Sequence, residues 1–192
     1  MPEVNYMKHK NIGLLWFFFL LFLSLSQFGL ALDKNSLDLF VESGGKLVVY
    51  LVRHAEKAAE PPADPPLTLR GQARAESLLQ LIPINELIAV YSTSLSRTLD
   101  TVRPTATEAG LAITEYSASD SPGLVEEIRA YKRGAILVAG HSNTLPEILC
   151  LLGVENRILI GDDEYGDLFI ITLRDQGKPS LQRARFGDDS GG

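Results

Sequence analysis

Cysteine is nearly absent from this chain, which carries a single Cys150 among its 192 residues. One cysteine cannot form a disulfide within the chain, so a folded domain must depend on its apolar core. Cys150 lies in the apolar run 149–152, and we expect it to be a small buried residue without a chemical role.

Positive charge is also in short supply. Lysine and arginine number 18 against 24 acidic residues, which gives a formal net charge of −6. This balance argues against nucleic acid as the main partner, although it leaves room for a local basic pocket that holds an anion.

The longest apolar run lies near the N-terminus, over residues 12–23. A short basic segment precedes it and small residues follow, so residues 1–31 have the pattern of a signal peptide that is cleaved after Ala31. Residues 12–32 are also about long enough to cross a bilayer, so an uncleaved membrane anchor is the alternative. Both interpretations predict an exported protein, periplasmic or secreted, and only the second keeps it on the membrane.

The rest of the chain has the length of one domain. Residues 32–45 are polar and predict a connector, residues 46–187 predict a single folded domain, and residues 188–192 predict a disordered tail. Strand-like apolar runs alternate with helical stripes through the domain. This alternation predicts an α/β fold of three layers (αβα), a mainly parallel sheet with helices on both faces.

The individual elements follow from periodicity and from start and stop signals. Strands are expected at residues 46–53, 87–91, 111–116, 134–141, 168–173 and 181–186. Helices are expected at residues 69–82, 95–110, 124–133 and 144–152. Pro104 should kink or break the second helix, and Thr144 with Glu147 fits a capping box at the start of the last. Arg70 and Arg74 are expected to be solvated helix residues.

Beyond residue 31 the chain contains only two histidines, and each ends a strand-like apolar run. His54 closes the first such run and His141 closes the run 135–141. Ligand sites in open α/β sheets lie beyond the carboxyl ends of strands. Two strands that each deliver an imidazole there predict one shared site.

Two arginines accompany these histidines. Arg53 precedes His54 directly, and Arg97 falls in the first turn of the expected helix 95–110. Helix N-termini attract anions, and the planar fork of arginine suits a phosphate group. The set predicts a pocket for a small phosphorylated substrate, with Asn143 at a strand-to-helix junction as a further binding candidate. No metal or other cofactor is expected, because two histidines lack a third ligand at metal spacing.

Four sequence blocks resemble those of the histidine phosphatase superfamily, which is also called phosphoglycerate mutase-like. They occur in the family's order at residues 52–56 (VRHAE), 67–71 (LTLRG), 91–101 (YSTSLSRTLDT) and 140–144 (GHSNT). Residues 165–169 (YGDLF) are also similar to a late strand of the family. The resemblance covers about residues 46–175, and its short form is similar to compact exported members.

The resemblance implies a role for each residue of the set. His54 would be the nucleophile and form a phosphohistidine, while Arg53, Arg97 and His141 would bind the phosphoryl oxygens. One departure is Ala55, where the family commonly has glycine. From the residues alone, the neighbouring arginines should favour the neutral imidazole that a nucleophile requires.

The proton donor is left open between two residues. The larger members of the family carry an acid in an insertion after the third strand, whereas this chain has only the short loop 117–123 there. Asp120 in that loop and Glu56 beside the first motif are the candidates. Glu56 has a second interpretation, in which it pairs with an arginine.

The preferred hypothesis is an exported phosphatase that hydrolyses a phosphate monoester or phosphoanhydride through a phosphohistidine. The alternative is a phosphate-binding or sensing module on the same fold, without catalysis. A phosphomutase ranks lower, since it must protect its phosphoenzyme from water and loop 117–123 offers little lid.

Overall fold

The computed structural model describes residues 46–155 and 158–187. The predicted leader, connector and C-terminal tail lie outside these residues. The described residues belong to one compact unit, Gly44–Gly192. No helix among them is both long and apolar enough to cross a membrane.

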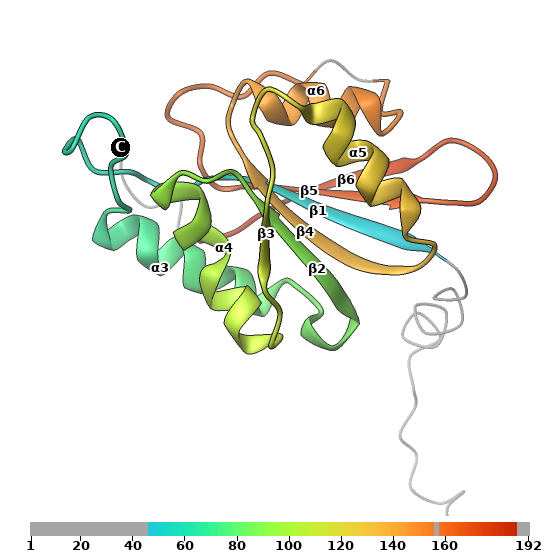
Figure 1. Ribbon diagram of the computed structural model, residues 1–192, viewed down its shortest axis with the longest axis horizontal. Coiled ribbons are helices and arrows are strands. Elements are labelled where there is room, and N and C mark those ends of the chain that lie inside the picture. The colour runs from blue at the N-terminus through green and yellow to red at the C-terminus, as the bar shows by residue number, and fades with distance from the viewer. Residues whose placement is uncertain (1–45, 156–157, 188–192) are drawn as a thin grey trace, which may run out of the picture. The chain divides into compact units, whose positions relative to one another are not determined.

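A six-stranded sheet forms the middle layer, with the strand order β3-β2-β4-β1-β5-β6 (Figure 1). The strands are β1 (Leu47–Arg53), β2 (Leu87–Ser92), β3 (Ile113–Glu115), β4 (Gly134–Gly140), β5 (Asp167–Leu173) and β6 (Ser180–Arg185). The four strands from β3 to β1 are parallel, whereas β5 runs antiparallel to both β1 and β6. The central strands β1 and β4 are buried almost throughout, which explains their unbroken apolar sequences.

Helices cover both faces of the sheet (Figure 1). They are α3 (Leu69–Ser77), α4 (Ser96–Glu108), α5 (Ser121–Ala130) and α6 (Thr144–Leu151), with short 3₁₀ turns at Leu78–Gln80 and Ile84–Glu86. One apolar cluster joins α5 and α6 to the sheet, and a second joins α4 and the 3₁₀ turn after α3 to the opposite face. The predicted α/β architecture, a mainly parallel sheet between two helical layers, is confirmed.

The structure contradicts a break of the helix at Pro104 and a capping box at the start of the last helix. Pro104 does not break α4, which continues to Glu108 because buried residues on both sides of the proline, Val102 and Ala106, pack on the sheet. Thr144 does not form a capping box with Glu147. Its hydroxyl instead accepts from the backbone N–H of His141 at 2.9 Å, and Glu147 accepts from Ser121 at 2.8 Å.

Two predictions about exposure are also wrong. Cys150 is exposed, because its neighbours Ile148 and Leu149 turn to the core and leave position 150 on the outer side of α6. Arg74 is only 4% exposed. It is buried because its guanidinium finds partners inside the protein, described below.

Candidate active site

The two histidines lie side by side at the carboxyl ends of neighbouring strands. β1 and β4 pair in parallel with Arg53 opposite Gly140, and the N–H of His54 donates to the carbonyl of Gly140 at 3.0 Å. His54 and His141 are therefore the first residues beyond the sheet on adjacent strands. Their ring centroids are 5.5 Å apart in an edge-on arrangement.

Arg53 and Arg97 bring positive charge to this edge. Both guanidinium groups are close enough to lower the pKa of each imidazole. Within the described residues, the buried Nε atoms of both arginines have no hydrogen-bond partner. A buried donor without a partner costs about 1–3 kcal/mol, so an oxyanion between the two arginines would satisfy groups that the fold leaves open.

Arg97 is placed by the start of α4. The carboxylate of Asp64 accepts from the backbone N–H of Ser96 at 2.9 Å and from its hydroxyl at 2.6 Å. One turn later, the Thr101 hydroxyl donates to the carbonyl of Arg97 at 2.7 Å and accepts from the N–H of Ala55 at 2.9 Å. These bonds tie the helix that carries Arg97 to the loop that carries His54.

The hydrogen bonding of His54 selects one tautomer. Its Nδ1 lies 2.8 Å from the carbonyl oxygen of Ala55. A carbonyl only accepts, so Nδ1 carries the hydrogen and Nε2 keeps its lone pair. His54 is 4% exposed and Ala55 is fully buried. In the neutral imidazole, Nε2 is therefore the basic nitrogen.

Burial, more than charge, keeps both rings neutral. Desolvation and then the positive charge of Arg53 and Arg97 lower the pKa of His54 to about 4, and its bond to Ala55 opposes the shift only in part. Burial and the same two arginines lower the pKa of His141 to about 4. The expected direction of the shift at His54 agrees with the structure, and burial is its main cause.

Thr93 is a site residue to which sequence reasoning gave no role. Its hydroxyl lies 3.0 Å from Nε2 of His141 and 2.9 Å from the hydroxyl of Thr98, and both threonines are buried. The signal was its position directly after β2, at the same edge of the sheet as the histidines. Through this contact with Nε2, Thr93 orients the ring of His141.

A second feature that sequence reasoning missed is the loop before β5. Nη1 of Arg53 donates to the carbonyl oxygens of Gly161 at 2.7 Å, Asp162 at 2.8 Å and Glu164 at 3.2 Å. The ring of Tyr165 lies over the same guanidinium, 4.3 Å from its central carbon. The acidic side chains of this loop are exposed, as a surface cluster should be, yet its backbone reaches the site.

The carboxyl groups of both candidate proton donors, Glu56 and Asp120, already have hydrogen-bond partners within the protein. Burial alone would raise the pKa of Glu56, but hydrogen bonds and charge from Arg74, with the charge of Arg70, lower it overall. The second interpretation of Glu56, as the partner of an arginine, therefore describes its contacts. Asp120 is exposed and caps α5 by accepting from the N–H of Gly123 at 2.9 Å.

Asn143 lies at the N-terminus of α6, two residues beyond His141. It is exposed, and its side chain makes no capping hydrogen bond.

Over the described residues, no group of three or more His, Cys, Asp or Glu side chains could hold a metal ion.

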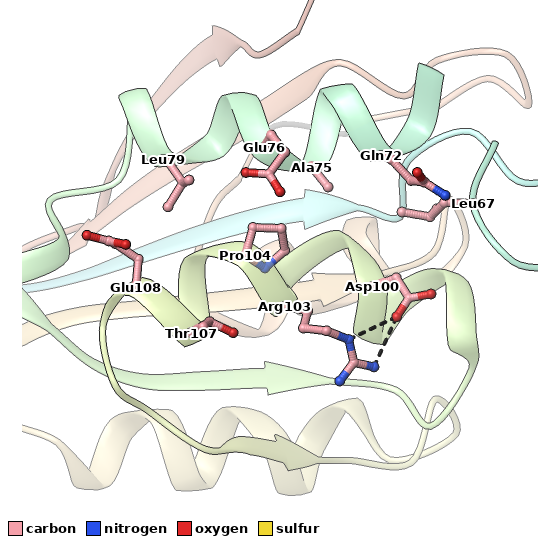
Figure 2. Close-up of a pocket in the computed structure, with 10 residues that line it drawn as sticks. All are labelled: Leu67, Gln72, Ala75, Glu76, Leu79, Asp100, Arg103, Pro104, Thr107 and Glu108. Atoms are coloured by element: carbon pink, nitrogen blue, oxygen red, sulfur yellow. Dashed lines mark hydrogen bonds and ion pairs between the residues drawn. The ribbon is translucent and has the colours of Figure 1, made fainter. Parts of the chain in front are cut away.

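A hollow of about 520 Å³ lies elsewhere, between α3 and α4 (Figure 2). It is lined by Leu67, Gln72, Ala75, Glu76, Leu79, Asp100, Arg103, Pro104, Thr107 and Glu108. Its only arginine is paired with Asp100, and two further carboxylates line it. Leu67 and Ala75 separate it from Ala55, against which they pack. Its charge therefore does not suit a phosphate group.

The comparison with protein families agrees with this geometry. The family model of the histidine phosphatase superfamily (branch 1) matches residues 49–118, a segment that includes Arg53, His54 and Arg97. Over this segment the chain is similar to the histidine phosphatase superfamily. This similarity supports a phosphatase. No curated protein matches the chain.

Solved structures of phosphatases share the fold. The protein histidine phosphatase SixA complexed with tungstate is 16% identical, with a TM-score of 0.57 over 72% of this chain and 96% of SixA. A phosphoserine phosphatase variant from Entamoeba histolytica, in complex with phosphoserine, is 16% identical. Its TM-score is 0.55, and the match covers 75% of this chain and 98% of the phosphoserine phosphatase chain. At these identities the likeness shows the fold alone.

Proposed function

We propose that this protein hydrolyses a phosphate monoester or phosphoanhydride through a phosphohistidine on His54. The observation that carries the proposal is the pairing of a neutral His54, whose Nε2 keeps its lone pair, with two arginines whose buried Nε atoms lack a hydrogen-bond partner. A nucleophile and a binding site for the phosphoryl oxygens thus share one edge of the sheet.

In the first step Nε2 of His54 attacks phosphorus, so an N–P bond forms while the bond to the leaving oxygen breaks. In the second step water attacks phosphorus, the N–P bond breaks, and inorganic phosphate leaves. Arg53 and Arg97 stabilise the negative charge on the equatorial oxygens throughout. The bound anion raises the pKa of His141, which then donates a hydrogen bond to it.

The binding-only alternative has one observation in its favour. Glu56 is ion-paired and Asp120 is used as a helix cap, so neither acid is available to protonate a leaving group as the site now stands. A module that binds phosphate without turnover would need only the two arginines and the two imidazoles.

The test uses the purified protein, p-nitrophenyl phosphate and a panel of phosphosugars, nucleotides and pyrophosphate. We expect turnover by the wild type, loss of at least about 1,000-fold in kcat for His54→Ala and His54→Gln, and acid-labile phosphate on the wild type only. Thermal denaturation checks that both variants fold. Turnover that survives in a folded His54 variant rules out the nucleophile, and vanadate binding without turnover on any substrate establishes the binding module.

We also propose that the protein is exported, on the sequence pattern of residues 1–31. The mass of the protein recovered from its native host decides this. A mature form that begins at Leu32 supports a cleaved leader, whereas an intact N-terminus in a membrane fraction supports the anchor over residues 12–32.

A further inference from the structure

The loop that precedes β5 reaches the site because β5 pairs with β1. Leu168 lies opposite Val52 in the antiparallel ladder, so the residues just before β5 lie beside the residues just after β1. Tyr165 is therefore delivered to Arg53 and His54, although more than 100 residues separate them in sequence. Its ring centroid is 5.9 Å from that of His54.

Arg53 is held on two sides by this loop. The three carbonyls of Gly161, Asp162 and Glu164 surround Nη1, and the ring of Tyr165 covers the plane of the guanidinium. Because Nη1 donates to these carbonyls, Nε and Nη2 remain as the two parallel donors that can bind two oxygens of a phosphoryl group. Arg53 is 6% exposed, so its position depends on these contacts and not on solvent.

The loop also has hydrogen bonds that do not involve the tyrosine ring. The N–H of Glu164 donates to the carbonyl of Gly161 at 3.1 Å, and the N–H of Gly161 donates to the Glu164 carboxylate at 2.9 Å. Next to Tyr165, the carbonyl of Gly166 accepts from the N–H of Phe186 at 2.9 Å. Removal of the ring should leave the loop in place and change mainly what the ring touches.

We propose that Tyr165 is a positioning residue that acts through Arg53: its ring fixes the guanidinium plane for phosphate and keeps water from His54. The inference rests on the proposed use of Arg53 and His54 as the phosphate site. It predicts two separable effects when the ring is removed. Anions bind more weakly, and the imidazole of His54 becomes better hydrated.

The experiment compares Tyr165→Leu, which removes the ring, with Tyr165→Phe, which keeps it. Tyr131→Leu is the matched control, because Tyr131 is also half-buried but lies after α5, where its hydroxyl contacts Tyr91. The dissociation constants of inorganic phosphate and vanadate are measured by calorimetry, and kcat/KM for p-nitrophenyl phosphate is measured as a function of pH.

For Tyr165→Leu we expect both anions to bind about 3- to 30-fold more weakly, the range for a buried cation–π contact. The acid limb of kcat/KM should move upward by at least about half a pH unit, because hydration of His54 removes part of the burial that lowers its pKa. Tyr165→Phe and Tyr131→Leu should stay within about twofold of the wild type.

A double-mutant cycle tests whether the ring acts through Arg53. In an Arg53→Lys background, which lacks the guanidinium plane, Tyr165→Leu should change anion binding by less than about twofold. Full persistence of the effect in that background overturns the proposal, as does unchanged binding and pH dependence in Tyr165→Leu. If neither Tyr165→Leu nor Tyr165→Met folds, the ring is structural and the proposal fails. Anion binding needs no turnover, so a failure of the phosphatase assignment would be seen separately, in the wild type.

Discussion

The Nδ1 atom of His54 lies 2.8 Å from the carbonyl oxygen of Ala55, and this contact leaves Nε2 as the basic nitrogen of a ring whose pKa is about 4. Attack requires the neutral form. We therefore expect kcat/KM to be constant from about pH 8 down to about pH 5 and to fall below pH 4 as His54 takes up a proton. A histidine with its ordinary pKa would place the acid limb near 6.5. A pH–rate profile with p-nitrophenyl phosphate distinguishes the two, and an acid limb near 6.5 would contradict the burial argument.

The same low pKa values make folding depend on pH. In the unfolded chain both imidazoles titrate near 6.5, whereas in the folded protein they titrate near 4. Between these values the unfolded state binds more protons, so the free energy of unfolding falls as the pH is lowered from 6.5 to 4.5. The loss should be about 2 kcal/mol for each imidazole.

Urea denaturation at pH 6.5 and 4.5 measures this loss. The matched variants are His54→Asn and His141→Asn, whose side chains do not titrate, and each should remove about half of the difference. Carboxylates titrate mainly below this interval, so a difference that persists in the double variant would assign the pH dependence to other groups.

The architecture was predictable where the chain marks it locally. β1 and β4 appear as unbroken apolar runs because both faces are covered, and each ends in a histidine, so their shared edge followed from the rule for parallel strands. Cys150 was misplaced because an apolar neighbourhood in sequence does not tell which residues of a short helix face outward.

The contacts that hold the site together come from residues far apart in sequence. Arg53 binds carbonyls 108 to 111 residues away, and Arg74 binds Glu56, 18 residues away, and the carbonyl of Phe186, 112 residues away. Backbone carbonyls carry no side-chain signature, so no motif could indicate that this loop closes on Arg53. The same reason hid the burial of Arg74, since an arginine on a helix is exposed unless distant partners meet it.

Asp120 gives a direct test of the missing proton donor. Asparagine caps a helix about as well as aspartate but cannot donate an acidic proton. We expect Asp120→Asn to keep kcat with p-nitrophenyl phosphate and with alkyl phosphates within about threefold, and Asp120→Ala to lower the free energy of unfolding by about 1 kcal/mol through loss of the cap. A large fall in kcat for alkyl phosphates in Asp120→Asn, with p-nitrophenyl phosphate spared, would identify Asp120 as the acid after all.

Thr93 should matter for catalysis more than for stability. Replacement by valine keeps the shape of the side chain but removes the hydroxyl that lies 3.0 Å from Nε2 of His141. We expect kcat/KM to fall about 10-fold in Thr93→Val, the equivalent of one hydrogen bond. Thr93→Ser keeps the hydroxyl and should recover most of the activity. Equal losses in both variants would mean that the methyl group, and thus packing, is what matters.

Arg74 supports the loop that follows His54. Its guanidinium binds both carboxylate oxygens of Glu56 and the carbonyl of Phe186, and it is buried between them. Arg74→Met would leave the carboxylate of Glu56 without its main partner, and removal of one member of a buried pair costs about 3 kcal/mol. The control is Arg103→Met, whose pairing with Asp100 is exposed and should contribute less than about 0.5 kcal/mol.

Urea denaturation of the two variants measures this difference, and Glu56→Gln completes the series. Glutamine can still accept from Arg74 but cannot supply an acidic proton, so this variant should retain kcat within about threefold if Glu56 only supports the loop. A collapse of kcat in a folded Glu56→Gln variant, with the basic limb of its pH profile abolished, would instead make Glu56 the proton donor. Its ion pair with Arg74 would then have to open during each turnover.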